Sequence, residues 1–297
     1  MKFAAIDIGT NAVRLLLSKV IEDGGPPLFK KEALVRMPLR LGEDVFTLDR
    51  ITDDKTGRLV DTITGFRHLI EAYPALDYMA LATSAMRVAE NGREVASIVA
   101  ERTGIKIEVI DGQREAEVIY ANHIEERLAP KGHYFYIDVG GGSTELSVIK
   151  KREMVAARSF KIGTVRTLTA GRSDDEWQRM KTWVKENTED SGSIVGIGSG
   201  GNINKIFKLA RIKEGRPLSY KQLIQMYKFL RSYTLQERIN ILKLRPDRAD
   251  VIIPASEIYL SAMKWAKAKR MFVPQFGLSD GIVHVLYERH RQEDGSS

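Results

Sequence analysis

The sequence predicts a two-domain α/β protein, from its length, from a repeated glycine-rich hairpin and from the alternation of strand and helix patterns. The chain has 297 residues, more than a single domain usually holds, so two domains of comparable size are expected. Hydrophobic residues make up 43% and charged residues 29%, the balance of an ordinary folded chain. We therefore expect structure throughout most of the sequence.

Two segments of the chain share one hairpin pattern. Residues 2–18 read KFAAIDIGTNAVRLLLS, and residues 133–149 read HYFYIDVGGGSTELSVI. In each, an apolar run ends at an aspartate, Asp7 or Asp138, and a glycine-rich turn leads into a second apolar run. The two aspartates lie 131 residues apart, which is the size of a domain, so each predicted domain contains one such hairpin.

Hydrophobic periodicity and turn residues predict the elements between and after the hairpins. Mainly helical structure is expected in the last third of the chain. A break at residues 129–132, just before the second hairpin, places the domain boundary near Ala121, with domains over 1–121 and 122–297. Packing of a C-terminal helix back on the first domain is left open. Helices are expected at 52–72, 85–102, 113–128 and 174–186, and strands at 78–82, 105–110, 154–160 and 193–197.

The composition excludes several classes of protein. Without cysteine the chain has no disulfide, thiolate metal site or thiol nucleophile, which suits a reducing compartment. The first residues lack the pattern of a signal peptide, and no segment approaches the roughly 20 apolar residues of a membrane span. We therefore expect a cytoplasmic protein without membrane contact.

The charge balance points to an anionic partner. Lysine and arginine number 46 against 39 acidic residues, a net charge of +7, and such an excess attracts anions through the summed field. The basic residues are dispersed among acidic ones, so no specific nucleic-acid-binding segment is predicted. The number of subunits stays open, and a homodimer is one expectation.

The first hairpin turn has the residues of a phosphate-binding loop. Gly9 allows backbone amides to approach a phosphate, and Thr10 and Asn11 add side-chain donors. The same pattern of aspartate followed by glycine also occurs in ordinary hairpins, so this turn alone does not decide its function.

The second hairpin turn is more specific, because three successive glycines followed by two hydroxyl residues form a nest of donors suited to phosphate oxygens. Asp138 and Glu145 flank this turn. Two carboxylates would repel an anionic ligand unless a divalent cation such as Mg²⁺ lay between them, so a metal is expected. The turn consists of Gly140, Gly141, Gly142, Ser143 and Thr144.

A third glycine-rich turn follows the predicted strand at 193–197 and opens a helix, whose N-terminus can face an anion. With Gly196 the run matches the glycine spacing of a dinucleotide site. The strand ending in an acidic residue that such a site needs does not follow, so phosphate binding is the better interpretation. The turn consists of Gly198, Ser199, Gly200, Gly201 and Asn202.

In this order the three turns resemble those of the actin/hexokinase/Hsp70 superfamily, and within it the chain most resembles the Ppx/GppA phosphatases. The match spans nearly the whole chain. It implies two actin-like, ribonuclease H-like domains with a cleft between them. Further matching segments are Thr83-Ser84-Ala85-Met86-Arg87, Val109-Ile110-Asp111-Gly112 with Glu115-Ala116, Gly163-Thr164-Val165-Arg166 and Arg245-Pro246-Asp247-Arg248-Ala249-Asp250.

The resemblance also implies roles for individual residues. Glu115 matches the glutamate taken as the base that activates water, and Arg87 matches an arginine that faces the phosphates. Asp138 and Glu145 match the acids that hold Mg²⁺, with Asp7 near the metal through water.

The residues alone also permit other roles. Glu115 could instead cap the helix expected to start at Gly112. Arg14 and Arg166 are further candidates for phosphate contact, because a guanidinium bonds two oxygens at once.

Two positions depart from the family pattern and leave substrate preference open. Arg114 stands where the family has the first glutamate of a signature pair, and Ser279 stands where it has an arginine. The chain also ends before the C-terminal helical domains of longer members, so processive action on long polymers is not expected.

We therefore predict a Mg²⁺-dependent phosphohydrolase that releases orthophosphate from inorganic polyphosphate or guanosine pentaphosphate by direct attack of water. The sequence does not decide between these substrates. An ATP-dependent small-molecule kinase of the same superfamily remains an alternative. A non-catalytic sensor that binds polyphosphate or (p)ppGpp is another.

Overall fold

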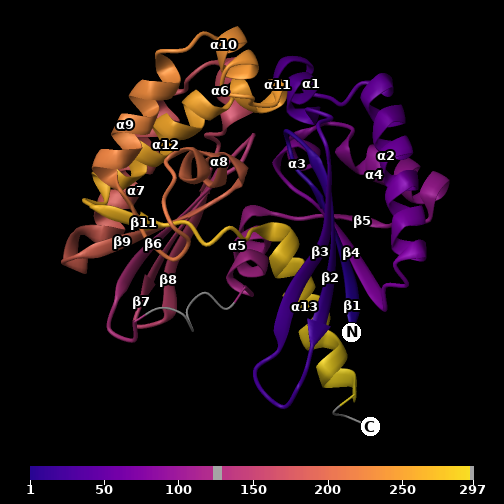
Figure 1. Cartoon of the computed structure of the whole chain (residues 1–297). Coiled ribbons are helices and arrows are strands. Elements are labelled where there is room, and N and C mark those ends of the chain that lie inside the picture. The colour runs from indigo at the N-terminus through magenta and orange to yellow at the C-terminus, as the bar shows by residue number, and fades with distance from the viewer. Residues whose placement is uncertain (123–128, 295–297) are drawn as a thin grey trace. The chain divides into compact units, whose positions relative to one another are not determined.

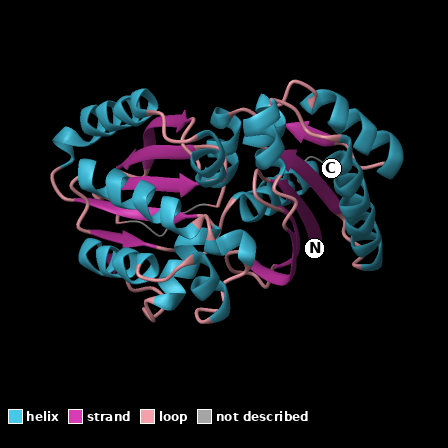
Figure 2. Cartoon of the chain, turned by 90° about the horizontal axis from the view of Figure 1, so that it is seen from above, coloured by secondary structure: helices cyan, strands magenta, loops and turns pink. Residues whose placement is uncertain are grey.

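The computed structural model describes residues 1–122 and 129–294, and it divides the chain into two compact units. Unit 1 contains Met1–Asn122 together with Phe276–Ser297, and unit 2 contains His123–Gln275. Each unit is built on its own β-sheet (Figure 1), and Figure 2 shows helices on either side of the strands. The predicted α/β fold class is confirmed.

The sheet of unit 1 has the order β3-β2-β1-β4-β5. Strands β1, β2 and β3 are antiparallel neighbours, whereas β1, β4 and β5 run parallel. The elements of unit 1 are β1 (Lys2–Ile8), β2 (Val13–Ile21), β3 (Leu28–Met37), α1 (Leu41–Leu48), α2 (Asp53–Ala72), β4 (Asp77–Ala82), α3 (Ser84–Val88), α4 (Gly92–Thr103), β5 (Ile107–Val109), α5 (Gly112–Tyr120) and α13 (Leu278–Asp294).

Helix α2 is stabilised by an N-terminal cap and by a buried apolar stripe. The Thr52 side chain accepts a hydrogen bond from the Lys55 amide and caps the first turn, as N-terminal threonines commonly do. Its apolar stripe, with Leu59, Ile63 and Phe66, is buried in the core of unit 1. The predicted helix at 52–72 is confirmed.

Helix α13 belongs to unit 1 although the rest of that unit lies at the other end of the sequence. It packs against β1, β2, β4 and α5 and buries Ile282 and Leu286 completely. Gly281 allows this approach, because a Cβ at that position would overlap the Val118 carbonyl oxygen. At the far end of the helix, Arg289 and His290 both contact the Asp77 carboxylate.

Unit 2 has a sheet of order β10-β11-β9-β6-β7-β8, and α12 packs against β6 and against several of the other helices. The core of this unit includes Tyr259 and Met263 from α12. The elements are β6 (His133–Val139), β7 (Thr144–Lys150), β8 (Glu153–Phe160), α6 (Thr164–Ala170), α7 (Asp174–Thr188), a 3-10 turn (Glu189–Ser191), β9 (Ile194–Ser199), α8 (Gly201–Leu209), β10 (Leu218–Ser219), α9 (Tyr220–Arg231), α10 (Leu235–Asn240), α11 (Pro246–Ala249), α12 (Ile252–Trp265) and β11 (Arg270–Phe272).

The prediction of one continuous helix at 85–102 is wrong. The structure has two helices there, α3 and α4, with a break at residues 89–91. Contacts from a distant segment produce the break. The Asn91 side chain accepts from the Ile51 amide (2.9 Å) and donates to the Ile51 carbonyl (2.8 Å). The Glu90 amide donates to the Asp49 carbonyl (2.9 Å).

Two other predicted elements are shorter than expected. The strand predicted at 105–110 is reduced to β5, and the helix predicted at 113–128 ends as α5 at Tyr120. Asn122 caps α5, because its side-chain amide donates to the Ile119 carbonyl (2.7 Å) and also to the Gly277 carbonyl (3.2 Å). Residues 123–128 of the predicted helix lie outside the described residues.

Strand β3 was not predicted. It lies at the edge of the sheet, and most of its residues are exposed, so its sequence LFKKEALVRM lacks the alternation of a half-buried strand.

In the described part of the chain, no helix is long and apolar enough to cross a membrane.

The contact at Gly281 gives a stability prediction. We expect Gly281→Ala to lower the free energy of unfolding by ~1–3 kcal/mol, because the added methyl group must displace the α5 backbone. The matched control is Gly65→Ala in α2, where nothing lies within 4 Å of the added Cβ. That substitution should stabilise the protein by ~0.5–1 kcal/mol through higher helix propensity. Urea unfolding measures both, and equal effects would contradict the close packing of α13 on α5.

Candidate functional site

The candidate residues of unit 1 gather at one edge of its sheet. The turn Gly9–Asn11 follows β1, Thr83 follows β4, and Ile110 follows β5. Hydrogen bonds join these strand ends: Thr83 N donates to Ile8 O (3.1 Å), and Ile110 N donates to Ala82 O (2.9 Å). Because the carboxyl ends of parallel strands share an edge, ligands of α/β sheets commonly bind there.

The first glycine-rich turn is fixed by the beginning of α1. Gly9 N donates to Ala12 O (3.1 Å) and closes the turn. The carbonyls of Thr10 and Asn11 then accept from the amides of Gly42 (3.0 Å) and Arg40 (3.2 Å). A Cβ at position 42 would overlap the Thr10 methyl group. The carbonyls of the turn are therefore directed toward α1.

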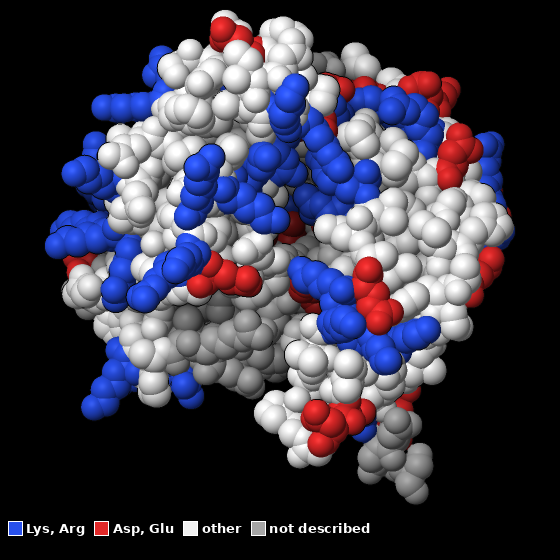
Figure 3. Space-filling model, viewed as in Figure 1, with Lys and Arg blue, Asp and Glu red and all other residues white. Residues whose placement is uncertain are grey.

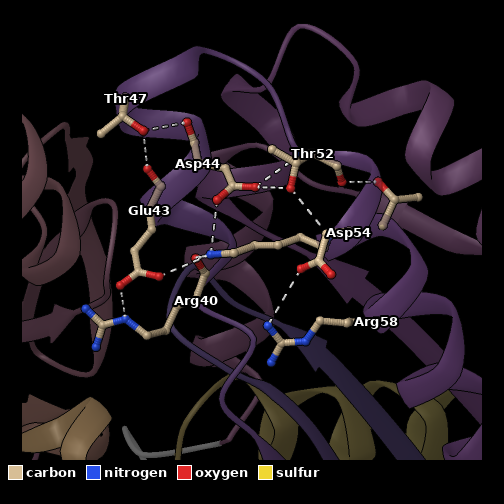
Figure 4. Close-up of polar contacts among 9 residues, drawn as sticks. Arg40, Glu43, Asp44, Thr47, Thr52, Asp54 and Arg58 are labelled. Carbon is tan, nitrogen blue, oxygen red and sulfur yellow. Dashed lines mark hydrogen bonds and ion pairs between the residues drawn. The ribbon is translucent and has the colours of Figure 1, made fainter.

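A network of polar contacts around the buried Lys55 holds α1 in this position (Figure 4). Lys55 of α2 donates to the Arg40 carbonyl (2.6 Å) and pairs with Glu43 and Asp44 of α1 (3.2 Å each). Asp44 accepts from the Thr52 hydroxyl (2.5 Å) and amide (3.1 Å). Lys55 thus connects the α2 N-terminus to the residues that hold the first turn.

The hydrogen bonds of this network change the pKa of Asp44. Burial by itself raises the pKa of that carboxyl, but hydrogen bonds from Thr52 and Lys55 outweigh it, and the net effect lowers the pKa below its usual value. A carboxyl whose pKa is lowered on folding stabilises the protein when ionised.

Asp7 and Arg14 form an ion pair across the first hairpin. They are directly opposite in the register of β1 and β2, and the Arg14 guanidinium lies 2.6 Å from the Asp7 carboxylate. Asp7 is buried. Its charge is therefore balanced within unit 1.

Glu115 lies in the first turn of α5 and pairs with Arg87. Arg87 Nη1 is 3.3 Å from a Glu115 carboxylate oxygen and donates to the Ile110 carbonyl (2.7 Å). Both side chains are largely buried. The helix cap is Asp111, which accepts from the Arg114 amide (2.7 Å). The N-cap of α5 is therefore Asp111, and Glu115 lies four residues further along the chain.

The two positions that depart from the family pattern differ in exposure. The Arg114 side chain is exposed and lies 3.5 Å from Glu117 on the same helix. Ser279 is buried near the start of α13.

The second glycine-rich turn has the same construction as the first. Gly140 N donates to Ser143 O (3.0 Å), and the amides of Thr164, Val165 and Arg166 at the start of α6 donate to the Gly140 and Gly141 carbonyls (2.8–3.1 Å). The carbonyls of the turn are thus directed toward α6.

The amides of this turn are available to a ligand. Within residues 129–294, those of Gly141, Gly142 and Ser143 have no hydrogen-bond partner. Arg166 also donates through its side chain to the Gly142 carbonyl (2.8 Å). The Thr144 hydroxyl donates to Ile162 O (2.6 Å), so its proton is engaged in holding the turn.

Asp138 and Glu145 are directly opposite in the register of β6 and β7. Side chains so placed lie on one face with Cβ atoms ~5 Å apart. Glu145 is buried and accepts from the Ser159 hydroxyl of β8 (2.9 Å). Among the described residues no group of three or more metal-ligating side chains occurs. Two facing carboxylates could together bind a hard divalent cation, whose remaining ligands would be substrate oxygens and water.

The third turn is shorter than predicted because β9 continues through Ser199. Gly198 lies in the strand, where a side chain would overlap Met271 of β11, so strand packing explains this glycine. Gly200 has a positive φ of 109° and turns the chain into α8, a conformation that favours glycine. Gly201 begins that helix, whose first amides have no acceptor within the helix.

Sequence reasoning missed several residues that hold the candidate site in place. The Arg14 pairing with Asp7 was not foreseen, although the two hairpins align Arg14 with Glu145, and this alignment was the available signal. Lys55 and Ser159 act through contacts distant in sequence, so no local pattern reveals them.

Known proteins similar to this chain are phosphatases. A sequence model described as the Ppx/GppA phosphatase family matches residues 26–290. Exopolyphosphatase 1 of Mycobacterium tuberculosis is 26% identical over 318 aligned positions, which cover 100% of this chain and 91% of that protein. The guanosine-5'-triphosphate,3'-diphosphate pyrophosphatase of Vibrio cholerae is 25% identical over 307 positions, covering 98% of this chain and 60% of that protein.

Solved structures support the fold. The crystal structure of an exopolyphosphatase from Cytophaga hutchinsonii matches with a TM-score of 0.81 at 24% identity, covering 97% of this chain and 98% of that one. A Ppx/GppA family member from Aquifex aeolicus matches with a TM-score of 0.75 at 24% identity and 98% coverage of both chains. The actin-like α/β fold predicted from the sequence is confirmed.

The lowered pKa of Asp44 gives a pH-dependent prediction. We expect Asp44→Asn to lower the free energy of unfolding at neutral pH by ~1–3 kcal/mol, because it removes the charged partner of Lys55 and Thr52. This contribution is present above the unfolded-state pKa of ~4. It should disappear as the pH falls through the lower folded-state value.

Denaturant unfolding of both proteins across this pH range measures the effect. The matched control is Asp54→Asn, also at the start of α2, since its side chain is 78% exposed and pairs only at 3.9 Å with Arg58. Such exposed pairs contribute little at any pH. A difference between wild type and Asp44→Asn that stays constant with pH would contradict the lowered pKa.

Proposed function

The chain belongs to the Ppx/GppA phosphatase family, and we propose that it releases terminal orthophosphate from short inorganic polyphosphate or from guanosine pentaphosphate by direct attack of water. Both substrates end in the same phosphoanhydride, and the similar proteins include one named for each activity. The observation that carries the proposal is the opposition of Asp138 and Glu145 beside a turn in which the Gly141, Gly142 and Ser143 amides have no hydrogen-bond partner among the described residues.

The glycine-rich turns are proposed to bind the substrate phosphates. Phosphoryl transfer needs little covalent chemistry from the protein, because positioning and neutralisation of the phosphate charges provide most of the rate. Amides fixed by hydrogen bonds on the carbonyl side of each turn need no reorganisation when they meet an anion. The candidate contacts are Gly9, Thr10 and Asn11 in unit 1, and Gly140, Gly141, Gly142, Ser143, Thr144, Gly198, Ser199, Gly200 and Gly201 in unit 2.

Asp138 and Glu145 are proposed to hold Mg²⁺, which, when bound, neutralises negative charge on the phosphate oxygens. Two carboxylates directly opposite each other on a sheet are mutually destabilising without a cation. Ser159 fixes one oxygen of Glu145. Asp7 was expected near the metal, but its ion pair with Arg14 favours an indirect role in which it holds the first hairpin.

Glu115 is proposed to orient and deprotonate the attacking water. Its pairing with Arg87 fixes the carboxylate at the carboxyl edge of the unit 1 sheet, where ligands of such sheets bind. Arg87 is proposed to face the substrate phosphates, since its planar guanidinium suits their oxygens.

The net charge and the surface of the protein are consistent with an anionic substrate. Figure 3 shows lysine and arginine side chains spread over the visible face with acidic groups among them, and the net charge is +7. A cytoplasmic location and a homodimer are further parts of the proposal. Cell fractionation and light scattering test them.

A phosphate-release assay with tripolyphosphate, long-chain polyphosphate, guanosine pentaphosphate and ATP tests the proposed activity. We expect release from tripolyphosphate or guanosine pentaphosphate with Mg²⁺ and without any acceptor molecule. Turnover of ATP alone, only in the presence of a small-molecule acceptor, would contradict the proposal in favour of a kinase. Binding of these anions without any turnover would favour a sensor.

Replacement of the proposed base tests the mechanism. We expect Glu115→Gln to lower kcat by roughly 10²- to 10⁴-fold, the usual contribution of a general base, with little change in substrate affinity. Glu117→Gln is the matched control, because Glu117 lies on the same helix with an exposed side chain. Steady-state kinetics with substrate binding by calorimetry measures both variants. A kcat near the wild-type value for Glu115→Gln would remove Glu115 from the mechanism.

Replacement of a proposed metal ligand tests the role of the paired acids. We expect Glu145→Gln to raise the Mg²⁺ concentration for half-maximal phosphate release by about tenfold or more, because one of two carboxylate ligands is lost. Glu153→Gln, at an exposed position on β8, should leave it unchanged. A Glu145→Gln enzyme with wild-type Mg²⁺ dependence would contradict the assignment.

A further inference from the structure

Tyr259 lies beneath the third glycine-rich turn and is completely buried in α12. Its hydroxyl donates to the Ser199 carbonyl at the end of β9.

The same hydroxyl and an Asp138 carboxylate oxygen both lie close to Gly200. Ser199 and Asp138 are partners in the register of β9 and β6. A Cβ built on Gly200 would lie 3.1 Å from an Asp138 carboxylate oxygen and 3.3 Å from the Tyr259 hydroxyl. The turn, the proposed metal ligand and the phenol thus pack against one another at Gly200, where no side chain intervenes.

Arg248 of α11 holds the next residue of the turn. Its guanidinium donates to the Gly201 carbonyl, and both of its terminal nitrogens lie 3.0 Å from a Cβ built on Gly201. The Gly200 carbonyl, which lies between those of Ser199 and Gly201 along the chain, accepts a hydrogen bond from the Asn204 amide of α8 (3.2 Å). Each carbonyl from Ser199 to Gly201 therefore has a partner on the protein side.

This arrangement differs from that of the two hairpin turns. In the hairpin turns, backbone amides at the start of α1 and α6 donate hydrogen bonds to the carbonyls of the turn. In the third turn, two side chains from helices late in the sequence do so instead. Because a peptide unit directs its amide away from its carbonyl, engaged carbonyls leave the amides of the turn directed to the opposite side.

We propose that Tyr259 is a positioning residue that fixes the third turn against Asp138, with Arg248 supporting the same turn. The hydroxyl acts through the Ser199 carbonyl and touches neither the substrate nor the metal. This inference rests on the proposed function, since Asp138 and the turn are its candidate contacts for Mg²⁺ and phosphate. Loss of the hydroxyl should therefore loosen the turn and weaken the metal site together.

Hydrogen–deuterium exchange of the full chain without substrate tests the positioning itself. In the Tyr259→Phe variant, we expect the amide protons of residues 199–204 to exchange at least about fivefold faster than in the wild type, which is the effect of losing one hydrogen bond. Exchange in the rest of unit 2 should be unchanged. Tyr287→Phe is the matched control, because Tyr287 is equally buried but donates to Glu22 in unit 1 (2.6 Å). Unchanged exchange at 199–204 in Tyr259→Phe would overturn the proposal, whether or not the protein releases phosphate.

Phosphate release tests the link to the site. We expect Tyr259→Phe to raise the Mg²⁺ concentration for half-maximal activity by about fivefold and the control to leave it unchanged. A purely structural role would lower the melting temperature without moving this concentration. Faster exchange of the turn with an unchanged Mg²⁺ requirement would therefore overturn the assignment of Tyr259 to the site. If the wild-type protein releases no phosphate, the proposed function fails, and the exchange experiment still decides the positioning.

Discussion

The three glycine-rich turns of the candidate site depend on one constraint: the protein must engage their carbonyl groups if their amides are to remain for the proposed ligand. In the two hairpin turns the start of a following helix satisfies the carbonyls of Thr10, Asn11, Gly140 and Gly141. The third turn relies on buried side chains of α11 and α12. Helix α1 is in turn held by the Lys55 network. The conformation of these turns therefore depends on residues that pack against their carbonyl side.

The two hairpins show how one repeated unit has acquired two electrostatic characters. Their backbone construction is the same, down to the hydrogen bond that closes each turn. At equivalent cross-strand positions, however, unit 1 pairs Asp7 with Arg14 and unit 2 pairs Asp138 with Glu145. The first pair is an ion pair, whereas the second brings two acidic side chains together. A single side chain at the start of the second strand of each hairpin decides this difference.

Much of the fold could be predicted because its signals are local. The apolar runs and turns of both hairpins, and the capped amphipathic pattern of α2, lie within short segments of sequence. The break at residues 89–91, the edge strand β3 and the supporting residues depend on distant partners, such as Ile51 for Asn91. For the candidate site, the sequence indicated which residues carry suitable chemistry, and the structure shows how Glu115 and Glu145 are held. Their roles remain predictions.

The path of the chain through the two units bears on how the protein is made. Unit 2 is one continuous segment, inserted between the two parts of unit 1. The insertion starts and ends beside a hydrogen bond from the Asn122 side chain to the Gly277 carbonyl. During synthesis on the ribosome, β1, β2 and β4 emerge before unit 2, whereas the helix that covers them, α13, emerges after it. The first domain to begin is thus the last to be completed, and its exposed apolar sheet must wait for the whole of unit 2 to be translated.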